Sequence, residues 1–176
     1  RGGAIALAIG IVVTAAVAAT LLTGGDVSRS SQDGGAERQA ALASEHAPTA
    51  GAADAKVHIV EFLDPACETC ALFYPMVKQW MAEVPGQIRL SVRHLAFHEG
   101  ADYAVKVLEA SRKQDKYWET LEALLMSQRQ WTQHHVVLPD RILPAIADVG
   151  LDMDQLQADM ESFEVKARIE QDKKDA

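Results

Sequence analysis

The chain has 176 residues with a formal net charge of −8 at pH 7, and 48% of its residues are hydrophobic. This length fits one domain with an appendage, and the hydrophobic content can supply a core. The acidic balance argues against nucleic acid as a partner, because phosphate binding requires a basic face.

Residues 1–25 predict a membrane-spanning helix or a signal peptide. After Arg1 no charged residue occurs up to Gly25, and the apolar stretch 4–22 is about the length that crosses a bilayer as a helix. Arg1 predicts an orientation with the N-terminus inside and the rest of the chain outside. The alternative is a cleaved secretory signal with its cleavage site near residues 16–19. Both readings send the rest of the chain to a compartment that permits disulfide chemistry.

Residues 26–55 predict a flexible linker, because they are rich in Gly, Ser, Ala, Gln and Asp and show no hydrophobic period. We expect the folded domain to cover residues 56–176 and to begin near Lys56. Its first strand is predicted at Val57–Leu63, a short apolar run typical of a strand covered on both faces.

A helix is predicted from about Cys67 to Glu83, followed by a second strand from Ile88 to Leu95. A strand, a helix and a strand in this order predict a parallel, right-handed unit. Pro75 removes a backbone donor within the helix and predicts a kink. The residues expected to form the buried stripe of this helix are Leu72, Phe73, Met76, Val77 and Trp80.

Residues 98–176 predict a helical insertion with no further strand. Its expected helices cover residues 101–115, 117–126, 139–149 and 152–169, and Asp152 is expected to cap the last of them. The adjacent His134 and His135 suggest a metal-binding site, but neighbouring residues on a helix do not share a face. We therefore expect these two histidines in an exposed loop.

The chain has only two cysteines, and they lie at the junction of the first strand and the first helix as Cys67-Glu68-Thr69-Cys70. This spacing in this setting indicates a redox-active dithiol. Cys67 at the helix start is predicted to be the attacking nucleophile, because unpaired backbone N–H groups and the helix dipole favour its thiolate. Cys70 is expected to be more buried and to resolve the mixed disulfide. Glu68 disfavours the thiolate, which predicts a weaker oxidant than a site with a histidine between its cysteines.

The segment 61–75 resembles the thioredoxin superfamily, and most of all the DsbA-like extracytoplasmic thiol:disulfide oxidoreductases. The resemblance implies an α/β thioredoxin-like fold with a helical insertion. It implies that Glu61 is the buried carboxylate that moves protons to and from Cys70. Pro75 matches the kink proline of the family's active-site helix.

The chain also departs from the family pattern. Ala66 stands where thioredoxins usually carry tryptophan, and Glu68-Thr69 stands where DsbA has Pro-His. The family's cis-proline, closing hairpin and final helix have no counterpart, because Pro139 and Pro144 lie in helical context. The fold is therefore expected to be incomplete at the C-terminus.

These features together predict a protein-disulfide oxidoreductase of the bacterial cell envelope. It would be a single-pass inner-membrane protein with its domain in the periplasm, or a periplasmic protein if the signal is cleaved. The expected partners are cysteine-containing proteins, a membrane or soluble redox partner and the bilayer, and no dissociable cofactor is implied. One alternative is a copper-binding module that uses Cys67, Cys70 and either His94 or His98, since thiolates suit Cu(I). Another alternative is a tethered interaction domain in which the disulfide is only structural and stabilises the start of the helix.

Overall fold

The structure is a computed structural model of the chain, and it describes residues 41–176. Residues 43–176 form one compact unit. The expected membrane segment 1–25 and residues 26–40 of the expected linker lie outside the described residues. Within residues 41–176, no helix combines the length and the apolar character needed to cross a membrane.

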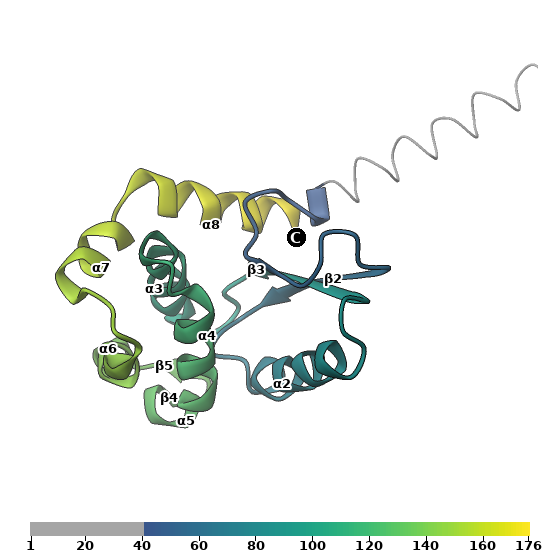
Figure 1. Cartoon of the computed structure of the whole chain (residues 1–176). Helices are drawn as coiled ribbons and strands as arrows, with labels where there is room; N and C mark the ends of the chain where they lie inside the picture. The colour runs from purple at the N-terminus through teal and green to yellow at the C-terminus, as the bar shows by residue number, and fades with distance from the viewer. Residues whose placement is uncertain (1–40) are drawn as a thin grey trace, which may run out of the picture. The chain divides into compact units, whose positions relative to one another are not determined.

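A three-stranded sheet in the order β1-β3-β2 lies at the centre of the compact unit (Figure 1). β2 (Val57–Leu63) and β3 (Ile88–His94) pair in parallel along their whole lengths. β1 (Thr49–Ala50) pairs antiparallel with the other edge of β3. The predicted parallel unit of strand, helix and strand is therefore confirmed.

The compact unit starts earlier than the expected boundary at Lys56. The β1 residues pair with β3, and the hydroxyls of Thr49 and Ser91 are hydrogen-bonded at 2.7 Å. Ala47, just before β1, is buried. A strand of two residues is too short to show a hydrophobic period, so the sequence pattern alone did not separate it from a linker.

The helix α2 (Glu68–Glu83) follows the turn that leads out of β2 and lies along one face of the sheet (Figure 1). The predicted buried stripe is wrong except for Val77, since Leu72 is 73% exposed and Met76 is 48% exposed. Phe73 and Trp80 are exposed as well, and Tyr74 is buried instead. Apolar residues surround most of this helix, so their spacing did not identify the inner face.

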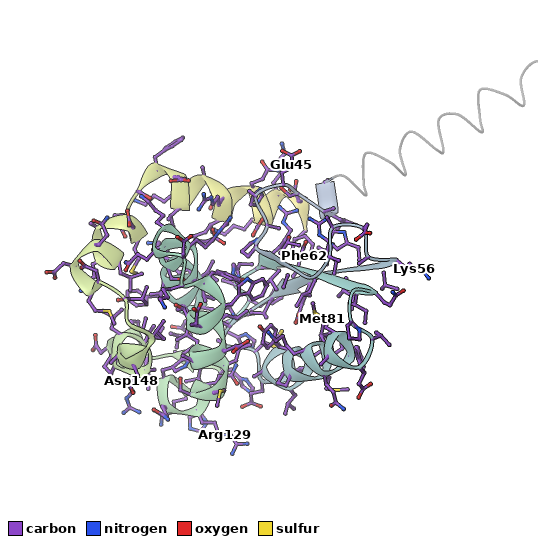
Figure 2. All side chains as sticks on the ribbon, in the orientation of Figure 1. Glu45, Lys56, Phe62, Met81, Arg129 and Asp148 are labelled. Atoms are coloured by element: carbon purple, nitrogen blue, oxygen red, sulfur yellow. The ribbon has the colours of Figure 1, made fainter. Side chains whose placement is uncertain are left out.

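The inner face of α2 is the one that carries Tyr74, Val77 and Met81. The side chain of Met81 packs against the core on the sheet side of the helix (Figure 2). Among the described residues, β2 has no strand partner on the edge away from β3.

The rest of the chain is mainly helical, as predicted. The helices are α3 (Ala101–Ser111), α4 (Tyr117–Met126), α5 (Gln128–Trp131), α6 (Ile142–Ala145), α7 (Met153–Met160) and α8 (Phe163–Asp175). Short 3-10 turns lie at Arg112–Gln114, Pro139–Arg141 and Ala147–Val149.

Two of the expected helices are interrupted. Residues 139–149 form the short α6 between two 3-10 turns. The expected helix 152–169 divides into α7 and α8, because the Oγ of Ser162 accepts a hydrogen bond from the Val165 N–H and starts a new helix. The predicted cap is confirmed, since Asp152 Oδ1 accepts from the Gln155 N–H at 3.0 Å.

A short hairpin of β4 (Thr132–Gln133) and β5 (Val136–Val137) lies within the helical part and was not expected. Its two turn residues, His134 and His135, have φ angles of 50° and 64°. Asparagine and glycine are the usual residues for such a turn, so two histidines carry no hairpin signal. Both are exposed, as predicted for a loop.

Candidate active site

The two cysteines lie where β2 leads into α2. Cys67 is the N-cap residue of α2 with an extended backbone, and Cys70 lies in the first helical turn. Both side chains are half-buried free thiols. Cys70 also packs against the hydrophobic core. Glu68 between them is exposed, so water screens its effect on Cys67 and the expected low oxidising power stays a prediction.

The two thiols differ in how they can react. Burial raises the pKa of the Cys70 thiol to about 12, and the nearby Cys67 thiol and Glu61 carboxyl contribute to the increase. At pH 7 a thiol with this pKa is ionised in about one molecule in 10^5. Because the thiolate is the attacking form, Cys70 needs a base before it can react.

Glu61 lies near Cys70, since its carboxyl contributes to the raised pKa of that thiol. Side chains alternate along a strand, and Ile59 and Leu63 on the same face of β2 as Glu61 pack in the core. Its Oε2 is buried and has no hydrogen-bond partner among the described residues. Burial raises the pKa of the Glu61 carboxyl to about 7. A carboxyl with a pKa near the working pH can both accept and release a proton.

Asp64 organises the turn that precedes the dithiol, and the sequence prediction missed it. Its buried carboxylate accepts hydrogen bonds from the Ala66 N–H at 2.8 Å and from the Phe97 N–H at 2.6 Å. It also accepts from the His98 N–H at 2.9 Å and bonds His98 Nδ1 at 2.8 Å. Hydrogen bonds therefore connect the turn before Cys67 to the loop after β3. An aspartate between a strand and a proline is a turn signal, but its partners are distant in sequence.

Hydrogen bonds from the helical part also hold the turn around Cys67. The buried side chain of Gln128 on α5 donates from Nε2 to the Pro65 carbonyl at 2.8 Å and to the Cys67 carbonyl at 3.0 Å. No sequence signal marked Gln128, because these contacts join segments about sixty positions apart.

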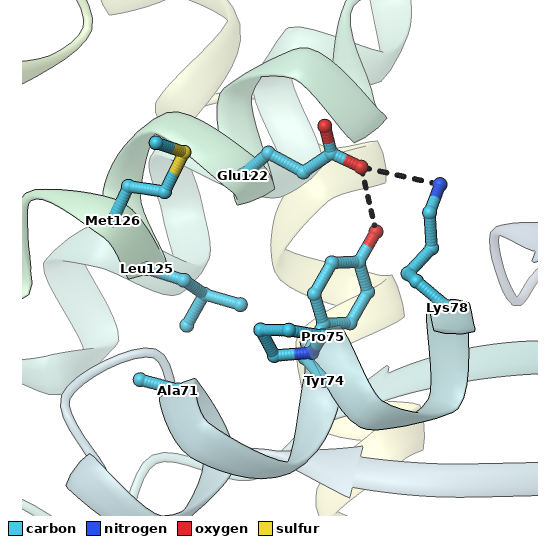
Figure 3. Close-up of a pocket in the computed structure, with 7 residues that line it drawn as sticks. All are labelled: Ala71, Tyr74, Pro75, Lys78, Glu122, Leu125 and Met126. Carbon is cyan, nitrogen blue, oxygen red and sulfur yellow. Dashed lines mark hydrogen bonds and ion pairs between the residues drawn. The ribbon is translucent and has the colours of Figure 1, made fainter. Parts of the chain in front are cut away.

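A cavity of about 270 Å³ opens between α2 and α4 (Figure 3). Ala71, which directly follows Cys70, forms part of its apolar wall with Leu125 and Met126. At its polar end Glu122 accepts a hydrogen bond from the Tyr74 hydroxyl at 3.1 Å and pairs with Lys78 at 3.2 Å. The residue after Cys70 therefore lines a cavity with one apolar side and one charged end.

Comparison with known proteins agrees with this geometry. The family model described as Thioredoxin matches residues 43–176. The chain belongs to the thioredoxin family. A thioredoxin-like oxidoreductase from Silicibacter pomeroyi DSS-3 has 31% sequence identity and a TM-score of 0.65, with 77% of this chain and 75% of that chain covered.

More distant members of the thioredoxin superfamily share the fold. Wolbachia pipientis alpha-DsbA1 has 18% identity and a TM-score of 0.64, with 78% of this chain and 70% of that chain covered. BdbD from Bacillus subtilis has 23% identity and a TM-score of 0.63, with 73% of each chain covered. At these identities the likeness shows the DsbA-like fold alone.

A relative of another kind is a Na(+)/H(+) antiporter NhaA from Herminiimonas arsenicoxydans. It is 29% identical over 122 residues, which is 69% of this thioredoxin-family chain. The match spans 19% of the length of that relative.

Each of the two candidate histidines of the copper-binding hypothesis has another partner in this thioredoxin fold. His94 is buried, and its Nε2 is hydrogen-bonded with the Tyr117 hydroxyl at 3.0 Å. His98 is paired with Asp64. Across residues 41–176, no three His, Cys, Asp or Glu side chains are grouped so as to hold a metal ion.

Replacing Glu61 by Gln is expected to change how the stability of the thioredoxin domain depends on pH. The folded-state pKa of about 7 exceeds the ordinary value of 4.5, so folding favours the protonated carboxyl. That stabilisation is complete below the ordinary pKa and is lost as the pH rises through the folded-state pKa. The urea midpoint of Glu61→Gln relative to wild type should therefore increase between about pH 5 and about pH 8.

The control for this experiment is Glu83→Gln, which changes an exposed carboxylate at the end of α2. Its midpoint should follow the wild-type midpoint across the same pH range. A constant difference between Glu61→Gln and wild type would show that Glu61 titrates as an ordinary surface carboxyl.

Proposed function

We propose that this chain is a thiol:disulfide oxidoreductase that exchanges disulfides with cysteine-containing proteins of the cell envelope. The observation that carries the proposal is the Cys67 and Cys70 pair at the start of α2 in a thioredoxin-family fold, with Glu61 on the adjacent strand face. The thioredoxin-like oxidoreductase from Silicibacter pomeroyi supports the same class of reaction.

In the proposed reaction, the Cys67 thiolate attacks a substrate disulfide. A bond forms between Cys67 Sγ and one substrate sulfur, and the other substrate sulfur leaves as a thiolate. Glu61 takes the proton from Cys70, and the Cys70 thiolate attacks Cys67 Sγ. The second substrate thiolate is released and a Cys67–Cys70 disulfide remains. Two electrons have passed to the substrate, and the reverse sequence oxidises a substrate dithiol.

The proposed cellular setting rests on the N-terminal sequence. The apolar stretch 4–22 has the length of a membrane anchor, and a domain beyond it would work in the oxidising envelope. We therefore include in the proposal a single-pass inner-membrane location, or a periplasmic one after cleavage. A membrane or soluble redox partner would restore the starting state of the dithiol.

The test measures insulin reduction and the refolding of a protein with scrambled disulfides, with the full chain kept in mild detergent. The wild-type chain should accelerate both reactions, and the Cys67→Ser/Cys70→Ser double variant should not. Retention of one Cu(I) per chain after dialysis, together with no exchange activity, would instead support the copper-binding module.

A further inference from the structure

One side chain from the helical part holds the backbone of the dithiol turn. Gln128 is 5% exposed, and both of its Nε2 hydrogens are directed at active-site carbonyls, those of Pro65 and Cys67. These contacts assign the orientation of the amide. If the amide were flipped, the Gln128 oxygen would face the two carbonyl oxygens and no hydrogen bond could form.

The Cys67 carbonyl has a second role at the start of α2. It accepts the Ala71 N–H at 3.1 Å, which is the first backbone hydrogen bond of the helical turn. Cys67 itself has φ −77° and ψ 118°, the extended backbone of an N-cap residue. A group that fixes the Cys67 carbonyl therefore also fixes the backbone from which the Cys67 side chain projects.

The amide of Gln128 is not what anchors α5. Trp131 of the same helix is fully buried, and its indole N–H donates to the Leu124 carbonyl at 3.0 Å. The neighbouring Arg129 and Gln130 are exposed. Burial of Trp131 thus holds α5 in the core, and the Gln128 amide is directed at the dithiol turn.

We infer that Gln128 is a positioning residue for disulfide exchange, which holds the Cys67 backbone in its extended conformation at the N-terminus of α2. The inference rests on the proposed function. The N-terminus of a helix interacts more favourably with a thiolate than with a thiol, so the placement of Cys67 at this end of α2 bears on its rate of attack. The helical part is then a component of the catalytic unit, because it supplies the group that keeps the nucleophile in place.

The test compares Gln128→Met with Gln130→Met. Methionine has nearly the length of glutamine but donates no hydrogen bond, and Gln130 is an exposed glutamine on the same helix. The rate of Cys67 alkylation by iodoacetamide is measured against pH, with peptide mapping to assign the label. Gln128→Met should react about tenfold more slowly near neutral pH, with its alkylation profile displaced to higher pH. Gln130→Met should match the wild type.

A further variant keeps the test valid if Gln128→Met does not fold. Glu at position 128 donates one hydrogen bond when protonated and repels both carbonyls when ionised. Alkylation of Gln128→Glu relative to wild type should therefore fall as the pH rises. Equal pH profiles for wild type and both Gln128 variants would overturn the inference.

The outcomes also separate the inference from the proposed function. A wild-type chain that reduces insulin and is unaffected by Gln128→Met upholds the function and removes the role of Gln128. A wild-type chain with no exchange activity, whose Cys67 alkylation still depends on Gln128, removes the function and keeps the positioning role.

Discussion

In the Cys67→Ser variant, the rate of insulin reduction is expected to fall to the uncatalysed background. The Cys70→Ser variant should instead accumulate a mixed disulfide between Cys67 and the substrate. The pKa of Cys70, raised to about 12 by burial, leaves almost no thiolate there to begin the reaction. We therefore expect Cys67 to start it, and a serine hydroxyl cannot replace the thiolate. Without the Cys70 thiol, the mixed disulfide has no internal group to resolve it.

The two single variants are distinguished by non-reducing gel electrophoresis and mass spectrometry after incubation with a disulfide-containing substrate. The adduct should appear for Cys70→Ser and be absent for Cys67→Ser. An adduct formed at Cys70 in the Cys67→Ser chain would show that the roles of the two cysteines are reversed. Thr69→Ser provides a matched control between the cysteines, since it keeps a hydroxyl at an exposed position.

Asp172→Ala is expected to lower the free energy of unfolding by about 3–5 kcal/mol, because it leaves a buried arginine short of its partner. Arg93 on β3 is fully buried and donates from Nε to Asp172 Oδ1 at 2.7 Å. The same carboxylate accepts from the His94 N–H at 2.8 Å and bonds His46 Nε2 at 2.7 Å. Asp172 therefore joins α8 to the sheet and to the segment before β1.

The arginine has two further contacts in this network. Its Nη2 pairs with Asp175 at 2.7 Å, and its Cζ lies 5.2 Å from the ring centroid of Phe62 on β2. Phe62 projects from the sheet on the side of α8 (Figure 2). The loss of Asp172 thus removes one of the carboxylates that balance a charge that water does not reach. Small domains have total stabilities of about 5–15 kcal/mol, so this variant should approach the limit of folding.

Urea denaturation measures this effect, with Glu170→Ala as the control. Glu170 lies on the same helix with 70% of its side chain exposed, and its pair with Lys173 should contribute less than about 1 kcal/mol. Arg93→Met/Asp172→Leu removes both buried charges and should recover part of the lost stability. An Asp172→Ala chain within about 1 kcal/mol of the wild type would show that the network adds little net stability.

The fold was predictable where the signal is local. The apolar run 57–63, the helix signals after Cys67 and the second apolar strand predicted the parallel β2–α2–β3 unit. Asp152 predicted a helix start because an N-cap bond joins residues three positions apart. The inner face of α2 was not predictable in this way. Leu72 and Met76 are as apolar as Val77, and only the position of the sheet decides which of them is buried.

In the candidate site, too, local features were predictable from the sequence and contacts between distant segments were not. The sequence by itself determined the dithiol, its place at a strand–helix junction and the carboxylate of Glu61 on the preceding strand, since all lie within ten consecutive residues. Only the tertiary structure decided that Asp64 and Gln128 hold the turn, and that the pKa values of Cys70 and Glu61 are raised. Hydrogen bonds to distant segments and the loss of water around a buried group depend on how the chain packs, and no local pattern of residues encodes that.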